Sequence, residues 1–168
     1  MEIYILSHKV EVYLNDKLIK KAKIRPERCF IKFKRKYMPG TLKAVAKDEK
    51  GNILGISMLK SASKEEKLYF YKENYPELKR FAYVHFYFGD NEGIISPHKE
   101  KTIEINNVKG GKLLRLGNAA SYNKIGYLTN KTSTYHAKAM AIFEYEENSQ
   151  EISFEITSEL GKEVIKIA

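Results

Sequence analysis

The chain has 168 residues, of which 43% are hydrophobic and 30% charged, and this composition is typical of a folded rather than a disordered protein. Lys and Arg number 30 against 21 Asp and Glu, so the formal net charge is +9. The sequence lacks an apolar run of about 20 residues, and its first residues lack the basic segment and cleavage site of a signal peptide. We therefore expect no membrane span and no leader, while the compartment stays open.

The first third of the sequence alternates polar and apolar residues with a period of two, as β-strands do. Residues 10–14 and 18–24 flank Asn15-Asp16, and this arrangement predicts a hairpin. Further strands are predicted at residues 28–34, 42–47 and 53–59. The single cysteine, Cys29, has neither a second thiol nor a local base, so we interpret it as a buried strand residue.

A polar stretch, residues 61–67, reads as a linker between domains 1–63 and 64–168. Beyond it, alternation resumes and predicts strands at residues 68–72, 81–88, 101–105, 113–116, 137–146, 151–157 and 164–167. Short strands with turn residues every 8–12 positions are typical of β-sandwiches. The sequence therefore predicts an all-β chain with two sandwiches in tandem.

A connection of about 20 residues, rich in Gly, Asn, Ser and Tyr, separates Leu116 from Ala137. Loops of this length in compact domains are usually functional or docked on another surface. We treat it as an interaction loop with the contact residues Asn118, Tyr122, Asn123, Tyr127, Asn130, Tyr135 and His136.

No combination of residues predicts catalysis or a bound cofactor or metal. The histidines, His8, His85, His98 and His136, lack the close spacing of a metal pair. The sequence also has no glycine-rich phosphate loop and no nucleophile elbow. We therefore expect no catalytic residue, no metal ligand and no cofactor site in this chain.

Two aromatic clusters have alternative readings. The basic run at residues 32–37 (KFKRKY) interleaves aromatics with cations, as single-strand nucleic-acid binders do, but we favour a lysine-protected edge strand. Tyr69, Tyr71 and Tyr75 are candidates for a sugar-binding platform, but we favour cross-strand packing.

Five segments, in order along the chain, resemble the C-terminal modules of glycoside hydrolase family 2, the β-galactosidase-type enzymes. Residues 10–17 are similar to a VELFLNGK hairpin, and residues 39–48 to a PGELKAVAYD segment. The three segments of the second half are residues 81–84 (FAYV), 111–118 (GKLLRLGN) and 130–143, which contains HAKAMAI at 136–142. The sequence departs from the family pattern at Asp16, at residues 118–121 and at Ala137. The long loop therefore differs in sequence from the family pattern at its tip.

The resemblance implies two tandem immunoglobulin-like β-sandwiches. It also implies that the catalytic glutamates lie on a preceding (β/α)8 barrel, which needs about 250 residues and is not part of this sequence. We therefore expect a non-catalytic C-terminal accessory region of a glycosidase, with the barrel as its partner in cis. Its role would be to support the barrel, domain packing or homo-oligomer contacts.

One alternative is an immunoglobulin-like carbohydrate-binding or adhesion module, motivated by the Tyr- and Asn-rich loop. A nucleic-acid binder acting through residues 32–37 is the least favoured reading. The substrate of the parent enzyme and its oligomeric state stay open.

Overall fold

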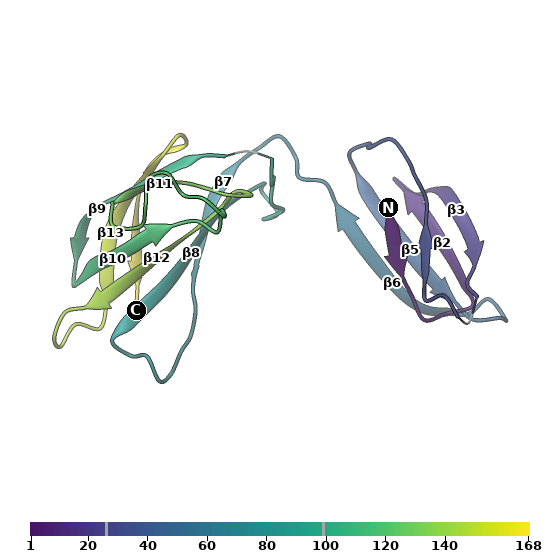
Figure 1. Ribbon diagram of the computed structural model, residues 1–168, viewed down its shortest axis with the longest axis horizontal. Helices are drawn as coiled ribbons and strands as arrows, with labels where there is room; N and C mark the ends of the chain where they lie inside the picture. Colours follow the sequence, from purple (N-terminus) through teal and green to yellow (C-terminus); the bar gives the residue numbers. More distant parts are fainter. Residues whose placement is uncertain (26, 99) are drawn as a thin grey trace. The chain divides into compact units, whose positions relative to one another are not determined.

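The computed structural model describes residues 1–25, 27–98 and 100–168. These residues form fourteen β-strands and no helix (Figure 1). No helix able to cross a bilayer is accordingly found among them. The chain divides into two units, Met1–Ser61 and Ala62–Ala168, and every strand pair is antiparallel. The prediction of an all-β chain with β-sandwich units in tandem is confirmed.

The first unit consists of a four-stranded sheet and a two-stranded one. The larger sheet has the order β3-β2-β5-β6 and the smaller pairs β1 with β4. The strands are β1 (Glu2–Tyr4), β2 (Lys9–Leu14), β3 (Lys17–Lys23), β4 (Phe30–Lys32), β5 (Thr41–Lys47) and β6 (Ile53–Lys60). The buried apolar residues are few: Val10, Val12 and Leu14 on β2 with Val45 on β5.

The predicted hairpin at the start of this unit is confirmed, and its turn explains the residues found there. Asn15 and Asp16 have φ of 49° and 61°, the left-handed values that a two-residue turn of type I′ requires. The Asn15 side chain also accepts a hydrogen bond from the Thr41 backbone N–H at 2.9 Å and donates one to the Pro39 carbonyl at 3.2 Å. Asn15 therefore fixes the turn and ties it to the start of β5.

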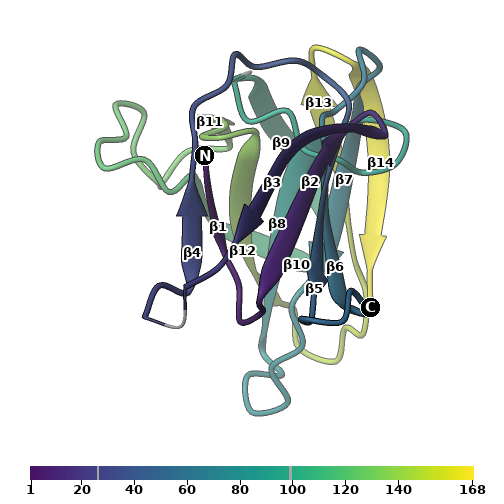
Figure 2. The ribbon, with the colours of Figure 1, turned by 90° about the vertical axis from the view of Figure 1, so that its right-hand side faces the viewer.

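The second unit is a sandwich of two four-stranded sheets, β10-β12-β8-β7 and β11-β9-β13-β14 (Figures 1 and 2). Its strands are β7 (Lys67–Lys72), β8 (Phe81–Gly89), β9 (Thr102–Lys109), β10 (Gly111–Gly117), β11 (Lys131–Ser133), β12 (Lys138–Tyr145), β13 (Ile152–Ser158) and β14 (Gly161–Ile167). The core lies between the sheets. At its centre the Phe154 ring stacks on Phe143, with 4.7 Å between ring centroids, and meets Phe86 edge-on at 6.1 Å.

The structure corrects three sequence-based expectations. Cys29 is exposed and precedes the short strand β4, so it is not a buried strand residue. The strands β1 and β11 were not predicted, because three residues are too few to show alternation. The long connection is also not a single loop. It comprises the irregular segment 118–130, then β11, then a tight turn at His136 and Ala137 with φ of 49° and 63°.

Candidate functional site

A row of directly opposed residues crosses the outward face of the β10-β12-β8-β7 sheet. Tyr71 on β7 is paired with His85 on β8, His85 with Met140 on β12, and Met140 with Gly117 on β10. The Tyr71 and His85 rings stack with centroids 4.7 Å apart and planes 5° apart. The aromatic pair Tyr71–His85 therefore lies at one end of this row. At the other end lies Gly117, which has no side chain to cover its backbone.

Neighbouring tyrosines extend the aromatic surface. Tyr69 stacks on Tyr87 with ring centroids 5.1 Å apart, and Tyr75 meets Tyr83 edge-on at 5.3 Å. The predicted cross-strand packing is confirmed for Tyr69 and Tyr71, whereas Tyr75 follows the end of β7 and packs on Tyr83 from the connection to β8. Because Tyr71 and Tyr75 remain 50% and 45% exposed, this packing still leaves ring surface available for contact.

The segment 118–130 folds back onto the end of β10. The Leu116 backbone N–H donates to the Tyr127 carbonyl at 3.1 Å. The Tyr127 ring lies against Gly117 so closely that a Cβ at position 117 would be 2.2 Å from the ring carbon Cδ1. Tyr127 therefore covers the open end of the row and faces the Tyr71–His85 pair across the sheet.

These residues border an open hollow of about 580 Å³ on the outward face of the sheet. Met140 and Ile142 contribute apolar lining, while Tyr71 and His85 line one side and Tyr127 the other. A second hollow of about 300 Å³ shares Tyr71, His85 and Lys138 with the first and extends past Tyr87. We call the two together the outer-face groove, lined by Tyr71, His85, Arg115, Tyr127, Lys138 and Met140.

The charge in this groove is positive. Arg115 and Lys138 line it, and its described lining residues include no carboxylate. Glu73 lies beside the groove, with Oε1 2.8 Å from His85 Nε2. A hydrogen bond from Tyr75 and the nearby His85 lower the pKa of Glu73, so this carboxylate stays ionised at neutral pH and is already engaged.

The asparagines of the predicted interaction loop shape the loop. Asn118 donates to the Ser133 carbonyl at 2.7 Å and accepts from the Ala120 N–H at 2.9 Å. Asn123 accepts from the Ile125 N–H at 3.1 Å, and Asn130 donates to the Asn106 side chain at 2.8 Å. These amides replace the ladder bonds that an irregular segment lacks.

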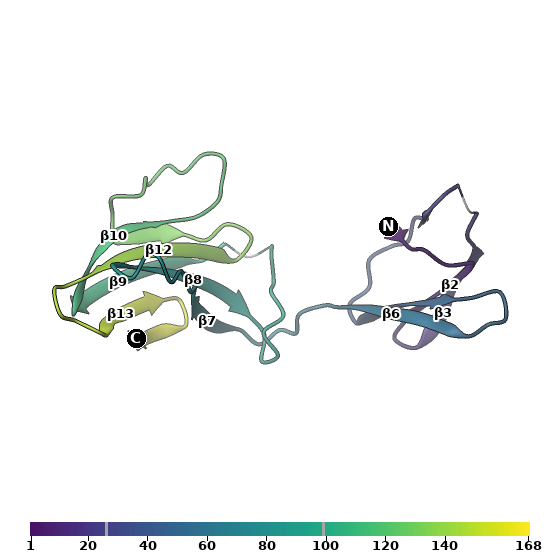
Figure 3. The same ribbon diagram turned by 90° about the horizontal axis from the view of Figure 1, so that it is seen from below.

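The aromatic residues of the predicted loop are mostly exposed. Tyr122 is 77% exposed, Tyr127 47% and Tyr135 37%, and the Tyr135 ring meets His136 edge-on at 4.2 Å. Figures 2 and 3 show the middle of segment 118–130 arching away from the body of its unit, while Tyr127 near its end contacts Gly117. Of the predicted contact residues, Asn118 and Tyr127 line the outer-face groove.

Sequence reasoning named Tyr71 as a candidate for a sugar-binding platform but missed the other strand residues of the groove: His85, Arg115, Lys138 and Met140. Their signal was the period-two alternation of the strands, which sets them on the face opposite the core. Among the described residues, no group of three or more His, Cys, Asp or Glu is arranged to hold a metal ion.

A second surface of interest is strand β6 in the first unit. β6 lies at one edge of its sheet. Its large apolar residues are 55–70% exposed: Ile53, Leu54, Ile56, Met58 and Leu59. The opposite edge strand, β3, carries Lys17, Lys20, Lys21 and Lys23, the usual protection of a free edge. We call this unprotected strand the β6 apolar edge.

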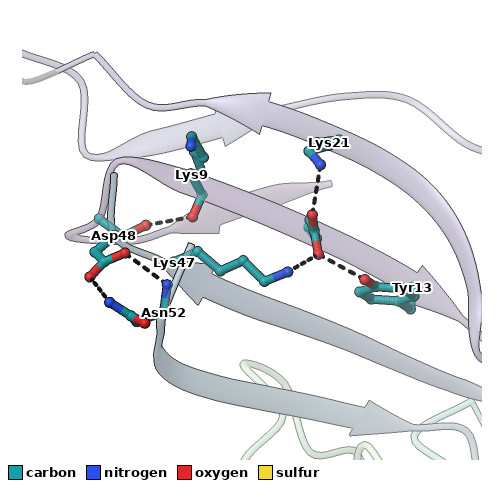
Figure 4. Close-up of polar contacts among 8 residues, drawn as sticks. Lys9, Tyr13, Lys21, Lys47, Asp48 and Asn52 are labelled. Atoms are coloured by element: carbon teal, nitrogen blue, oxygen red, sulfur yellow. Dashed lines mark hydrogen bonds and ion pairs between the residues drawn. The ribbon is translucent and has the colours of Figure 1, made fainter. Parts of the chain in front are cut away.

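Glu11, on β2, is the central charge of the first unit. Its carboxylate contacts Lys47 Nζ at 2.6 Å and Lys21 Nζ at 3.0 Å, and it accepts a hydrogen bond from the Tyr13 hydroxyl at 2.8 Å (Figure 4). These partners, Lys47 foremost, lower the pKa of Glu11 to about 2. Because a general acid needs a raised pKa, Glu11 fits a structural role.

The basic run at residues 32–37 begins in the two-stranded sheet. Lys32, the last residue of β4, lies 2.7 Å from Glu2 Oε1 on the neighbouring strand β1. The Tyr37 ring is 76% exposed, and its hydroxyl donates to Ser61 Oγ at 3.0 Å. Part of the run therefore has partners within its own unit.

Comparison with known proteins finds one matching family and several solved structures with a similar fold. Residues 1–55 match the family described as Domain of unknown function (DUF4982). No curated protein matches the sequence. A solved glycosyl hydrolase family 2 member from Bacteroides cellulosilyticus covers 99% of this chain, with a TM-score of 0.86 and 20% identity.

Two further solved structures agree. A beta-glycosidase from Bacteroides vulgatus covers 96% of the chain with a TM-score of 0.73 and 16% identity. A beta-glucuronidase from glycoside hydrolase family 2 also covers 96%, with a TM-score of 0.79 and 13% identity. The chain spans only 24%, 21% and 17% of the lengths of these three structures.

The chain thus has the fold of a part of glycoside hydrolase family 2 proteins. The resemblance to this family predicted from five sequence segments is confirmed at the level of the fold.

Proposed function

We propose that this chain is a non-catalytic C-terminal accessory region of a glycoside hydrolase family 2 enzyme of the β-galactosidase type. The observation that carries the proposal is the fold match, which covers 99% of this chain but 24% of a family 2 structure. In this proposal the catalytic glutamates lie on a (β/α)8 barrel in the same polypeptide. The role of the two β units is to pack against that barrel and support it.

The β6 apolar edge supports the packing role. Ile53, Ile56 and Met58 are each at least 55% exposed on a strand whose outer backbone edge is unpaired within its sheet. Contiguous apolar surface of this kind marks a protein interface, and an unprotected strand edge in a free domain promotes aggregation. We infer that the barrel side of the parent enzyme covers this strand, with a second copy of the enzyme as the competing occupant.

A turnover assay tests the absence of catalysis. The purified chain is expected to hydrolyse neither a chromogenic β-galactoside nor a chromogenic β-glucuronide, whereas the parent enzyme hydrolyses one of them. Turnover by the purified 168-residue chain, after removal of host glycosidases, would contradict the proposal.

The reading frame that encodes the chain tests whether the parent protein contains a catalytic barrel. A (β/α)8 barrel with two glutamates at the ends of its strands is expected upstream of codon 1. A frame that encodes no barrel would overturn the accessory role and would leave the groove as the main functional feature.

The outer-face groove favours a second candidate function, an immunoglobulin-like carbohydrate-binding or adhesion module. Tyr71 and Tyr127 line its two sides, and tyrosine rings give the amphipathic surfaces on which sugars stack. Calorimetry of the chain with galactans and mucin-type glycans tests this function, and the absence of heat with every glycan counts against it.

A further inference from the structure

The two cations of the outer-face groove lie at different positions along it. Arg115 on β10 is opposite Ile142 on β12, and Lys138 lies four residues before Ile142 on the same strand. Four residues of β-strand span roughly 13 Å. The two cationic side chains therefore start from backbone positions roughly 13 Å apart along the groove.

Neither cation has an anionic partner among the residues that the structure describes. Many lysines of the chain lie in salt bridges, as Lys47 and Lys101 do, but Arg115 and Lys138 form none with the described residues. Two carboxylates on the strands of this sheet or next to it are already engaged, since Glu73 contacts His85 and Glu144 pairs with Arg80. Charge complementarity thus calls for a ligand that brings its own anions.

The position of the groove on the sheet argues against a peptide ligand. An extended peptide binds best by adding a strand to a free sheet edge, where unpaired backbone groups give it hydrogen bonds. The groove lies over β8 and β12, and each of these is paired with a strand on both sides. A ligand that lies across β8 and β12 is therefore recognised there by side chains and not by strand addition.

The number of cations argues against nucleic acid. A nucleic-acid strand carries one phosphate per nucleotide, and its binding proteins neutralise several of them with Lys and Arg. The Lys and Arg side chains that line the described groove are Arg115 and Lys138. His85 also lines it and lies beside the Glu73 carboxylate. Two well-separated charges match a polymer in which anions are sparse.

The aromatic sides of the groove match sugar rings. His85 and Gly117 lie on strands separated by β12, so their backbones are roughly 9–10 Å apart across the sheet. His85, stacked on Tyr71, lines one side of this interval and Tyr127 the other, with Met140 between them. This interval accommodates a ring in van der Waals contact with both sides.

We propose that the outer-face groove binds an oligosaccharide that carries carboxylate or sulfate groups. Arg115 and Lys138 contact the anions, and Tyr71 and Tyr127 stack on the sugar rings. The inference rests on the second candidate function, glycan binding, and is independent of the packing role of β6. It adds the class of ligand and the residues that recognise it.

Calorimetry with the full 168-residue chain tests the ligand class. Three oligosaccharides of matched length are compared: an oligogalacturonate, a heparin-derived oligosaccharide and a neutral galacto-oligosaccharide. The proposal expects one of the two charged oligomers to bind at least about tenfold more tightly than the neutral one, with affinity that falls as salt rises. A single-stranded oligonucleotide is the fourth ligand, and preferential binding of it would overturn the proposal.

Charge variants identify the residues. The double variant Arg115→Gln/Lys138→Gln is expected to lose about tenfold or more in affinity for the charged oligomer. The matched control, Lys162→Gln/Lys166→Gln, removes the same net charge from β14 on the other sheet and is expected to bind normally. Equal losses in both variants would mean that net charge alone drives binding, and this would overturn the assignment of the site.

The outcomes distinguish glycan binding from the recognition of anionic groups on the glycan. Equal binding of the neutral and charged oligomers would overturn anion recognition and leave glycan binding intact. Binding of no glycan by the folded chain would overturn both. Tyr127→Ala is expected to weaken binding while Tyr122→Ala, on the same loop, leaves it unchanged; far-UV circular dichroism verifies the fold of each variant.

Discussion

The Tyr127 ring rests on the backbone of Gly117, and a Cβ on residue 117 would be 2.2 Å from the ring. This contact joins the irregular segment 118–130 to the end of β10 and forms one side of the groove. Any side chain at residue 117 must displace the ring, because the first atom it adds occupies the space of Tyr127.

Gly117→Ala is therefore expected to destabilise the second unit by about 1–3 kcal/mol, the usual effect of overpacking. Urea unfolding measures the loss, and faster proteolysis within residues 118–130 reports the released loop. Gly55→Ala is the matched control, because a Cβ at Gly55 meets nothing within 4 Å. Adding Tyr127→Ala should relieve much of the Gly117→Ala penalty, and full additivity of the two changes would contradict the contact.

Glu11 predicts a pH dependence for the first unit. Its pKa in the folded state is about 2, below the ordinary value of 4.5, so the folded state favours the ionised carboxylate. Its contribution to stability is therefore complete above about pH 4.5 and is lost as the pH falls toward 2. Glu11→Gln is expected to weaken the unit at pH 7 and to flatten this acid dependence. Urea midpoints between pH 7 and pH 2.5 provide the measurement, with the exposed Glu163→Gln on β14 as control.

The core of the second unit depends on Phe154, which is 1% exposed and contacts both Phe143 and Phe86. Phe154→Ala removes these contacts and leaves a cavity, so we expect a loss of about 3–5 kcal/mol. Chemical denaturation measures it. Tyr122→Ala, at a site 77% exposed, should change the free energy of unfolding by less than about 0.5 kcal/mol. Comparable effects of the two variants would contradict the packing described for this core.

The β6 apolar edge predicts separate effects in the chain alone and in the parent enzyme. Ile56→Lys and Met58→Lys replace side chains that are 55% and 64% exposed, so the isolated chain should keep its stability and aggregate less. In the barrel-bearing polypeptide the same changes should loosen the two β units from the barrel and lower the melting temperature.

Val164→Lys, at a site 68% exposed on β14, is the control for these two variants. Thermal melts of the isolated chain and of the full enzyme provide the comparison. An enzyme insensitive to all three changes would exclude β6 as the packing surface. Weaker dimerisation with an unchanged barrel contact would instead identify a second copy as the occupant.

The sequence by itself determined most of the strands, though not β1 and β11, because alternation and turn residues are local properties. The turn at Asn15-Asp16 needs two left-handed residues, and the alternation of β8 separates Phe86 from His85 onto opposite faces. Composition and resemblance also predicted the fold class without reference to any long-range contact.

Only the tertiary structure decided which residues form the groove. The row Tyr71, His85, Met140 and Gly117 exists because three strand pairs adopt one register, and these residues are far apart in the chain. Apolar and aromatic residues occupy both faces of β8, so alternation alone did not say which face is the core. The position of Tyr127 over Gly117 depends on hydrogen bonds within an irregular loop, and no periodic pattern encodes them. Register and loop closure depend on contacts between residues far apart in the chain. For this reason, the residues of the groove could be identified only from the paired strands of the tertiary structure.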